Sequence, residues 1–371
     1  MKISFDSLVF TTQRYGGVSR YIISLAQALK DLGHEVDILG KYHVNEYLAD
    51  SFCGYKNNLT KIQKFPPKTR RLLHLLNDAC GSWRACLNKP DIYHESFHHT
   101  RSLVASSVPH VVTVHDMIYE VLASDFPGHG RSTEIKRKSV ARADHVICIS
   151  NQTKSDLIEH FGISEDKISV VYHGSEWLSE SDENEFIQNK SLEFIRKPYI
   201  LYVGSRNGYK NFGTLLKAFA SEKFFNDLDL RCFGGGPLTR DELAQARSLG
   251  MPGKSLIQSS GSDLDLAKLY RNASAFVYPS SYEGFGMPPL EAMTMGCPVV
   301  ASSQAPMPEI IGKAGLFFTC MDHKELGSQL KRVLEPSEAE RLKSLAKAQV
   351  AKFSWQKCAE ETVNVYESLL K

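Results

Sequence analysis

The chain has 371 residues, and at roughly 150 residues per domain this length predicts two domains. It carries 44 Lys and Arg against 42 Asp and Glu, a net charge of +2, so the whole molecule has no bias toward polyanions. With 42% hydrophobic and 23% charged residues it is not a largely disordered chain. No apolar run approaches the roughly 18–20 residues that span a bilayer, and the first six residues do not resemble a signal peptide. We therefore expect a soluble, cytoplasmic protein.

The eight cysteines form no C-x-x-C pair and show no metal-ligand spacing. Cys148, Cys232 and Cys297 lie in apolar, strand-like runs, where a buried reduced thiol is the ordinary state. This pattern argues against a disulfide scaffold, a zinc module and a thiol redox enzyme.

Short apolar runs alternate with amphipathic stretches along the whole chain, which is typical of βα units around parallel sheets. In the first half we expect strands at residues 3–8, 35–39, 92–93, 110–114, 145–150 and 168–173. Helices are expected there at residues 18–32, 131–142 and 152–161.

An acidic stretch at residues 174–189 has little periodicity and indicates an exposed connection between domains. After it, strands are expected at 199–203, 230–233, 256–258, 275–278 and 298–301, and helices at 212–220, 240–248, 264–272, 290–295, 337–352 and 354–370. We therefore predict an α/β fold of two Rossmann-like domains, residues 1–180 and 197–353, whose parallel sheets face an inter-domain cleft, followed by a terminal helix at 354–371.

The only strong charge asymmetry lies at residues 56–89, where eight Lys and Arg face the single acid Asp78. Leucines such as Leu72 and Leu76 are embedded in this stretch. It is either a solvated helix of its domain or a surface for an anionic acceptor or an anionic membrane. Both interpretations stay open at this point.

The most informative segment is Ser280–Ala292, S-S-Y-E-G-F-G-M-P-P-L-E-A, which follows an expected strand. Its glycines and proline pair predict a turn that leads into a helix starting near Pro288 or Pro289. Glu291 would then lie in the first helical turn and Glu283 in the loop before it. Backbone N–H groups at such a helix start can bind an anion, and the two carboxylates can accept hydrogen bonds from sugar and ribose hydroxyls. The alternative is a first-turn Glu on the helix dipole with an unrelated loop Glu.

With two glutamates separated by seven residues inside E-G-F-G-x-P-x-L-E, this segment resembles the signature of the retaining glycosyltransferases of family 4, which have the GT-B architecture. Four further features match in the expected order: the Gly16-Gly17 loop, His115 in V-H-D, V-G-x-x-x-x-x-K-N at 203–211, and F-G-G-G-P at 233–237. The final helix resembles the one that crosses back to the first domain in that family. The resemblance implies that the donor contacts are made by Gly16, Gly17, Gly204, Gly261, Gly284, Phe285, Gly286, Met287, Leu290 and Glu291.

Lys210 and Arg206 follow a strand end, where ligands bind in open α/β sheets. A nucleotide-sugar leaving group gains charge on its diphosphate, which these two cations could neutralise without a metal. Many family members carry the Arg directly after the Gly, whereas Ser205 stands there in this chain. The resemblance makes His115, Arg206, Lys210 and Glu283 the catalytic candidates, with His115 against the transferred sugar.

Two D-x-D sequences, at 227–229 and 263–265, imitate a metal motif of other glycosyltransferases. The first precedes a strand and the second begins a helix, where acids are common. We expect no metal ion and no other cofactor to be required; the nucleotide-diphosphate sugar is a co-substrate.

The resemblance implies a retaining glycosyltransferase of polysaccharide biosynthesis that moves a hexose from a nucleotide-diphosphate sugar to a glycan or lipid-linked saccharide, without nucleic acid as a partner. UDP-hexose is the first expectation for the donor and GDP-mannose the second. Peripheral contact with the inner membrane face, through residues 56–89, is an open possibility. Rival classes are a GT-B epimerase or hydrolase, a non-catalytic binding protein and an NAD-dependent oxidoreductase; no strand is followed by the G-x-G-x-x-G that the oxidoreductase needs.

Overall fold

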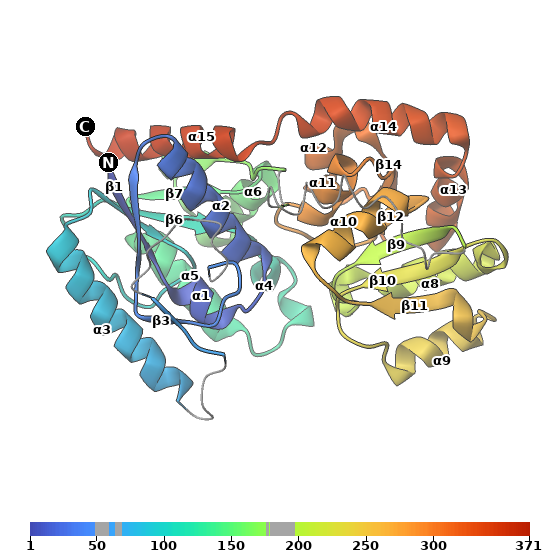
Figure 1. The fold of residues 1–371 in the computed structure, drawn as a ribbon, viewed down its shortest axis with the longest axis horizontal. Coiled ribbons are helices and arrows are strands. Elements are labelled where there is room, and N and C mark those ends of the chain that lie inside the picture. Colours follow the sequence, from blue (N-terminus) through green and yellow to red (C-terminus); the bar gives the residue numbers. More distant parts are fainter. Residues whose placement is uncertain (49–58, 64–68, 176–177, 179–196) are drawn as a thin grey trace. The chain divides into compact units, whose positions relative to one another are not determined.

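The computed structural model describes residues 1–48, 59–63, 69–175, 178 and 197–371. The chain divides into two compact units, one formed by Met1–Gly174 with Ser354–Lys371 and the other by Ser175–Phe353. Each unit contains a six-stranded parallel sheet with helices packed on it (Figure 1). The predicted α/β class with two parallel sheets is therefore confirmed.

The sheet of the first unit has the order β2-β1-β5-β6-β7-β8. Its strands are β1 (Lys2–Asp6), β2 (Glu35–Leu39), β5 (Ile92–Glu95), β6 (His110–Val114), β7 (His145–Cys148) and β8 (Ile168–Val170), and a separate parallel pair is formed by β3 (Tyr42–His43) and β4 (Thr60–Lys61). The helices of this unit are α1 (Leu8–Thr12), α2 (Gly17–Asp31), α3 (Arg70–Asn88), α4 (Ile118–Val121), α5 (Gly130–Arg142), α6 (Asn151–Phe161) and α15 (Trp355–Leu369).

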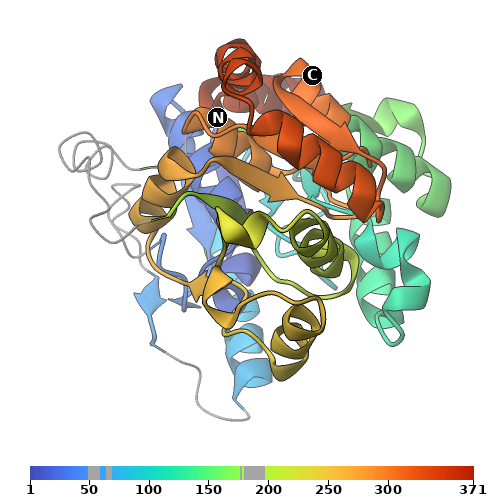
Figure 2. The same ribbon diagram turned by 90° about the vertical axis from the view of Figure 1, so that its right-hand side faces the viewer.

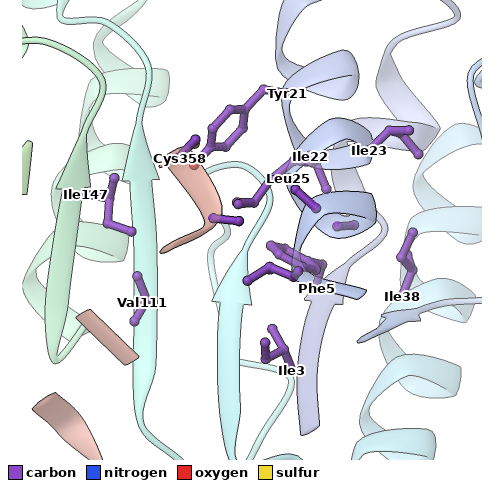
Figure 3. Close-up of a cluster of buried hydrophobic side chains, with 14 of the residues drawn as sticks. Ile3, Phe5, Tyr21, Ile22, Ile23, Leu25, Ile38, Val111, Ile147 and Cys358 are labelled. Carbon is purple, nitrogen blue, oxygen red and sulfur yellow. The ribbon is translucent and has the colours of Figure 1, made fainter. Parts of the chain in front are cut away.

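The core of this unit lies between its sheet and the apolar face of α2 (Figure 3). Ile22 and Leu25 point from α2 onto Phe5 of β1, and all three side chains are fully buried. Each such side chain stabilises the fold by about 1.5–3 kcal/mol relative to its exposed state. Cys358 of α15 joins the same cluster, so the C-terminal helix is part of this core.

A buried chain of hydrogen bonds also attaches α15 to the sheet. The Tyr366 hydroxyl lies 2.6 Å from His94 Nδ1, and His94 Nε2 lies 2.8 Å from the Thr113 hydroxyl. The Tyr21 hydroxyl of α2 lies 3.2 Å from the same Thr113 oxygen. Burial, with smaller contributions from His115 and His110, lowers the pKa of His94 to about 3, so its ring is neutral. Residues almost at the C-terminus are thus fixed to two central strands.

The sheet of the second unit has the order β11-β10-β9-β12-β13-β14 (Figure 2). Its strands are β9 (Tyr199–Val203), β10 (Asp229–Phe233), β11 (Leu256–Ser259), β12 (Ala275–Tyr278), β13 (Val299–Ser302) and β14 (Gly315–Phe318). Its helices are α8 (Phe212–Ser221), α9 (Arg240–Ser248), α10 (Asp263–Asn272), α11 (Met287–Thr294), α12 (Met307–Ile311), α13 (His323–Val333) and α14 (Pro336–Val350).

The bounds differ from the sequence expectations at a few places. The strand expected at 145–150 ends at Cys148, because the Ser150 hydroxyl accepts the Thr153 N–H and begins α6. The strand expected at 168–173 ends at Val170, and Leu8 begins a short helix instead of ending β1. β3, β4, β14, α4, α12 and α13 were not predicted, and α3 was expected only as one interpretation of residues 56–89, without bounds. The connection expected at 174–189 lies almost entirely outside the described residues.

Among the residues that the structure describes, none of the helices combines the length and the apolar content that crossing a bilayer requires.

Candidate active site

The strand order of the second unit creates a natural ligand site. β9 is the first strand of the unit, and it lies between β10 and β12, so the order of the sheet reverses beside it. In open α/β sheets, ligands bind at the carboxyl ends of the strands that flank such a reversal. The segments that leave β9 and β12 at this point carry Lys210 and Glu283.

Lys210 and Glu283 form a largely buried ion pair. Lys210 Nζ lies 2.6 Å from Glu283 Oε1, and the two side chains are 16% and 12% exposed. Nζ also lies 5.0 Å and 5.6 Å from the ring centroids of Tyr209 and Tyr278. Burial alone would lower the pKa of Lys210, but the charge of Glu283 and the Tyr209 hydroxyl outweigh it and raise the pKa. Two catalytic candidates separated by 73 positions are thus brought together, with the lysine fully charged.

Arg206, the other expected cation, pairs with a glutamate and with backbone carbonyls of its own unit. Its Nε donates to Glu242 Oε1 at 2.7 Å, and its side chain is only 2% exposed. Its terminal nitrogens donate to the carbonyl oxygens of residues 234–237 at 2.9–3.4 Å. These bonds tie the guanidinium to its own unit, and the role of Arg206 as a diphosphate clamp stays a prediction. Arg206 holds the glycine turn that follows β10.

That turn needs glycine for two reasons. Gly234, Gly235 and Gly236 have φ angles of +76°, +68° and +75°, a region that side chains strongly disfavour. A Cβ on Gly235 would also stand 2.4 Å from the carbonyl oxygen of Gly204. The turn therefore packs directly against the end of β9, and Arg206 closes it from one side.

The helix of the E-G-F-G-x-P-P-L-E segment starts slightly earlier than expected. α11 begins at Met287, with Gly286 in the capping position at φ +108°. Pro288 and Pro289 then hold the second and third helical positions, where neither has an N–H to offer. The expected anion site at this helix start therefore has fewer N–H donors than an ordinary helix start. Binding of an anion there would depend more on the charge of Lys210.

Glu291 lies in the second turn of α11, not in the first, because of this early start. It is only 5% exposed, and its Oε2 accepts a hydrogen bond from the buried Tyr270 hydroxyl at 3.1 Å. The alternative of a first-turn Glu on the helix dipole is therefore wrong. A buried, hydrogen-bonded carboxylate is well fixed to accept a further hydroxyl.

The other motif residues divide into core and loop positions. Phe285 and Leu290 are 3% and 0% exposed, and Phe285 packs edge-on against Phe353. Their side chains belong to the core, so any donor contact at these positions would come from the backbone. Glycine is favoured at position 286 by its φ of +108°, and a Cβ there would also displace the end of the Met307 side chain, which lies 2.6 Å away.

The remaining expected donor residues lie in the same unit. Gly204, at the end of β9, has φ +116° and open space where a Cβ would be. Gly261 precedes α10, Gly284 lies in the loop after Glu283, and Met287 is the first residue of α11.

His115 directly follows β6 in the first unit and is 6% exposed. Burial, with a smaller contribution from Lys136, lowers its pKa to about 3, so the ring is neutral. Its Nε2 is buried and has no hydrogen-bond partner among the described residues. The Tyr21 ring packs edge-on against it at 5.1 Å. A buried polar atom without a partner needs an explanation, and a hydrogen bond to a ligand hydroxyl is one that agrees with the expected role of His115.

Gly16 and Gly17 begin α2 in the same unit. Gly16 has an extended backbone, and a Cβ there would collide with the Gln13 side chain. Gln13 Oε1 accepts the Ser19 N–H at 3.1 Å and so caps the helix. Gly17 is exposed and has nothing within 4 Å of a Cβ position, so its backbone is open to approach.

One acid of each D-x-D sequence has a structural role. Asp265 closes a capping box with Ser262 at the start of α10. Asp229 lies at the start of β10, within 4.0 Å of Lys197 and 3.8 Å of Arg231. These contacts account for the second acid of each sequence.

Sequence reasoning missed four residues that position the site. Tyr209 and Tyr278 flank Lys210, Glu242 holds Arg206, and Tyr21 packs on His115. The adjacency of Tyr209 to Lys210 and the position of Tyr278 at a strand end are the signals that could have found two of them. Glu242 and Tyr21 lie on helices and have no such signal.

The first Rossmann-like unit carries a neutral histidine at a strand end. The second carries a buried Lys–Glu pair where the order of its sheet reverses. Two such units are the architecture of the GT-B glycosyltransferases. A family profile described as "Glycosyltransferase Family 4" matches residues 15–175, and one described as "Glycosyl transferases group 1" matches residues 183–349. The two matches span most of the chain, and the chain belongs to the family 4 glycosyltransferases.

Named relatives and solved structures agree with this membership. The chain is 27% identical to the O-antigen chain mannosyltransferase B of Escherichia coli, over 95% of this chain and 96% of that protein. It is 28% identical to the O-antigen chain mannosyltransferase RfbU of Salmonella typhimurium, over 87% and 88%. The fold is similar to sucrose-phosphate synthase from Thermosynechococcus elongatus (TM-score 0.72, 19% identity, 99% and 98% covered). It is equally similar to Anabaena Alr3699/HepE in complex with UDP and glucose (TM-score 0.72, 17% identity, 99% and 100% covered).

Proposed function

We propose that this enzyme transfers a mannosyl residue from GDP-mannose to a saccharide acceptor in the assembly of a polysaccharide of the O-antigen type. The observation that carries the transferase chemistry is the Lys210–Glu283 pair at the sheet reversal. The names of the relatives, both O-antigen chain mannosyltransferases, support mannose over the UDP-hexose of our first expectation. The likeness to a UDP complex, at 17% identity, supports the fold alone.

Lys210 would neutralise the diphosphate as the bond to the sugar breaks. Its charge is fixed in a site that is mostly closed to water, where an electrostatic contact stabilises the transition state far more than it would in solvent. When the diphosphate replaces Glu283 as the partner of Lys210, the Glu283 carboxylate can accept hydrogen bonds from sugar hydroxyls. The ion pair therefore keeps the lysine charged and in place until the donor binds.

Glu283 is the one candidate for a covalent nucleophile, because a retaining mechanism through a glycosyl-enzyme needs a carboxylate at the anomeric carbon. The resemblance to family 4 places Glu283 against sugar hydroxyls and not at the anomeric carbon, so we do not expect it to attack that carbon. We propose front-face displacement instead. The acceptor oxygen forms the new bond to the anomeric carbon, the bond from that carbon to the β-phosphate oxygen breaks, and the acceptor proton passes to the departing diphosphate.

His115 would contact the transferred sugar through its unpartnered Nε2. A neutral imidazole nitrogen can either donate to a hydroxyl or accept from one, according to its tautomer. Because its pKa is about 3, the ring keeps this neutral form throughout the physiological range. A buried hydrogen bond between the imidazole and the sugar discriminates strongly against sugars that lack the matching hydroxyl.

We propose that the reaction needs no metal ion, because Lys210 supplies the positive charge that a metal would otherwise provide. Turnover should therefore continue in EDTA. Complete loss of activity in EDTA, with recovery on addition of Mn²⁺ or Mg²⁺, would contradict this part of the proposal.

The donor and the class of reaction can be tested in one experiment. The full-length enzyme is incubated with GDP-mannose, UDP-glucose or UDP-galactose, each with and without a lipid-linked saccharide extract, and nucleotide release and glycan products are measured. We expect GDP release from GDP-mannose to rise on addition of acceptor and a mannosylated product to form with retained configuration. Turnover with a UDP-sugar only would restore the first expectation. Equal turnover without acceptor would indicate the rival epimerase or hydrolase.

A further inference from the structure

Five of the large apolar side chains exposed in the described part of the molecule lie on one helix, α3. Leu72, Leu75, Leu76, Trp83 and Leu87 are 57%, 58%, 43%, 66% and 61% exposed. Single exposed leucines are ordinary on a protein surface, but a contiguous group of this size marks an interaction site. Figure 1 shows α3 on the outside of the first unit.

These side chains form one continuous stripe, which also includes the exposed Ala79 and Cys86. The stripe positions recur at intervals of three and four residues, so at 3.6 residues per turn they fall within an arc of about 120°. From Leu72 to Leu87 the stripe is about 22 Å long. No charged residue lies within it. We call this surface the α3 apolar stripe.

The stripe is not needed to hold α3 on its own unit, because the opposite face does so. Asn77 Oδ1 accepts the backbone N–H groups of Lys41 and Tyr42 at 3.1 and 2.9 Å. Gly81 lets the helix approach closely, since a Cβ there would meet Leu103 at 3.2 Å. With the buried Ala85, these residues recur every four positions and form the inner face of α3.

A further contact fixes the rotation of the helix. Arg84 donates to Asp37 at 2.6 Å and to the carbonyl oxygens of Ile38 and Gly40 at 3.3 Å, which anchors α3 along β2. The helix therefore cannot turn its leucines inward without breaking a charged hydrogen bond.

Charge identifies the partner. The segment at 56–89 contains eight Lys and Arg and one acid, Asp78, and two of these bases are paired within the unit, Lys61 with Glu46 and Arg84 with Asp37. The Asp78 carboxylate lies 3.2 Å from His99 Nε2, so its charge is directed at its own unit. Arg71 and Lys89 are exposed at the two ends of the stripe. Three other bases of the segment, Lys56, Lys64 and Lys68, lie outside the described residues.

We propose that α3 binds the surface of an anionic phospholipid bilayer, with the stripe inserted among the headgroups and the flanking bases against lipid phosphates. A helix with one Leu- and Trp-rich face and basic flanks lies in the plane of the interface in this way. Trp83 suits that position, since an indole ring has an apolar body and one polar N–H. A second copy of the chain fits less well, because it would set the same basic segment against itself.

This proposal goes beyond the proposed function and holds for any donor sugar. It is tested by sedimenting the full-length protein with vesicles of equal parts phosphatidylglycerol and phosphatidylcholine, and with vesicles of phosphatidylcholine alone. We expect binding to the anionic vesicles at about 0.05 M salt, with release at about 0.5 M, where charges are screened over a few ångströms.

Three variants separate the contributions. Leu75→Ser with Leu76→Ser and Trp83→Ser removes the stripe, and Arg71→Glu with Lys89→Glu reverses its flanks. Each should lower the partition coefficient at least tenfold, since every base near an anionic surface contributes roughly a factor of five and every inserted large apolar side chain contributes at least as much. The matched control is Lys217→Glu with Lys347→Glu, which makes the same change in net charge at exposed positions of the second unit and should bind like wild type.

Donor hydrolysis by each variant shows that it is folded and that the catalytic site is intact. Equal binding by wild type and all three variants would overturn the proposal. A second result would also overturn it: the wild type binds neither kind of vesicle and elutes as a dimer, whereas the stripe variant elutes as a monomer. The stripe would then join two copies of the chain.

Discussion

Replacing Arg206 by Met distinguishes a positioning role from the diphosphate clamp suggested by the sequence. The substitution keeps an aliphatic side chain of similar length but removes the ion pair with Glu242 and the hydrogen bonds to residues 234–237. Breaking a buried ion pair by removing one partner costs about 3–5 kcal/mol, because the other charge is left without a partner. The Arg206 side chain is 2% exposed and that of Glu242 is 14% exposed, so the pair is largely buried and this range sets the upper scale of the effect.

The Glu242 carboxylate would bear much of this cost. Burial alone would raise its pKa, but hydrogen bonds from Thr239 and Arg206 outweigh burial and lower it. The lowered pKa means that this carboxylate contributes stability above its unfolded pKa, and that the contribution is lost as the pH falls through its folded pKa. Without Arg206 part of this stabilisation disappears, and the glycine turn loses the donor that closes it.

The assay is thermal unfolding by calorimetry, in which the two units can give separate transitions. For a unit of this size each kcal/mol lowers Tm by about 2–4 °C, so we expect a fall of roughly 6–20 °C in one transition. Glu242→Met combined with Arg206→Met should recover part of the loss, since the unpaired carboxylate is gone. A variant that unfolds like wild type but turns over about a hundredfold more slowly would refute the reasoning and restore Arg206 as a clamp.

Three further outcomes are expected. Lys210→Ala should reduce kcat about a hundredfold, on the order of 3 kcal/mol, through loss of charge stabilisation in a partly dry site, and unchanged kcat at saturating donor would contradict the assignment. Glu291→Gln should raise the donor KM more than it lowers kcat, whereas Glu283→Gln should chiefly lower kcat; steady-state kinetics showing the reverse would exchange their roles. Burial lowers the pKa values of His94 and His115 to about 3, so the unfolded chain binds protons below about pH 6.5 that the folded chain does not. The free energy of unfolding in urea should therefore fall from pH 7 to pH 5, less steeply in His94→Asn, and a constant value would contradict buried neutral rings.

Periodicity and local chemistry in the sequence were enough for most of the architecture. The expected strands at 35–39, 110–114 and 199–203 match β2, β6 and β9 residue for residue, because each is a short run of alternating or continuous apolar residues bounded by His, Pro or Gly. β14 was missed because it is a four-residue strand that begins with glycine, and its pairing with β13 defines it. The segment around Glu283 and Glu291 could also be found from sequence, since its glycines and prolines specify a turn and a helix start locally.

What the tertiary structure decided depends on contacts between residues far apart in the chain. Lys210 meets Glu283 because β9 and β12 are neighbours in the sheet, and Arg206 meets Glu242 because the turn after β10 packs on the end of β9. No local pattern distinguishes a cation that awaits a diphosphate from one already bound to five acceptors. Likewise the sequence placed leucines on α3, but only the docking of its opposite face on β2 shows that they remain exposed. Side chains of the same chemical type thus acquire different roles from burial and from their partners, which the fold alone supplies.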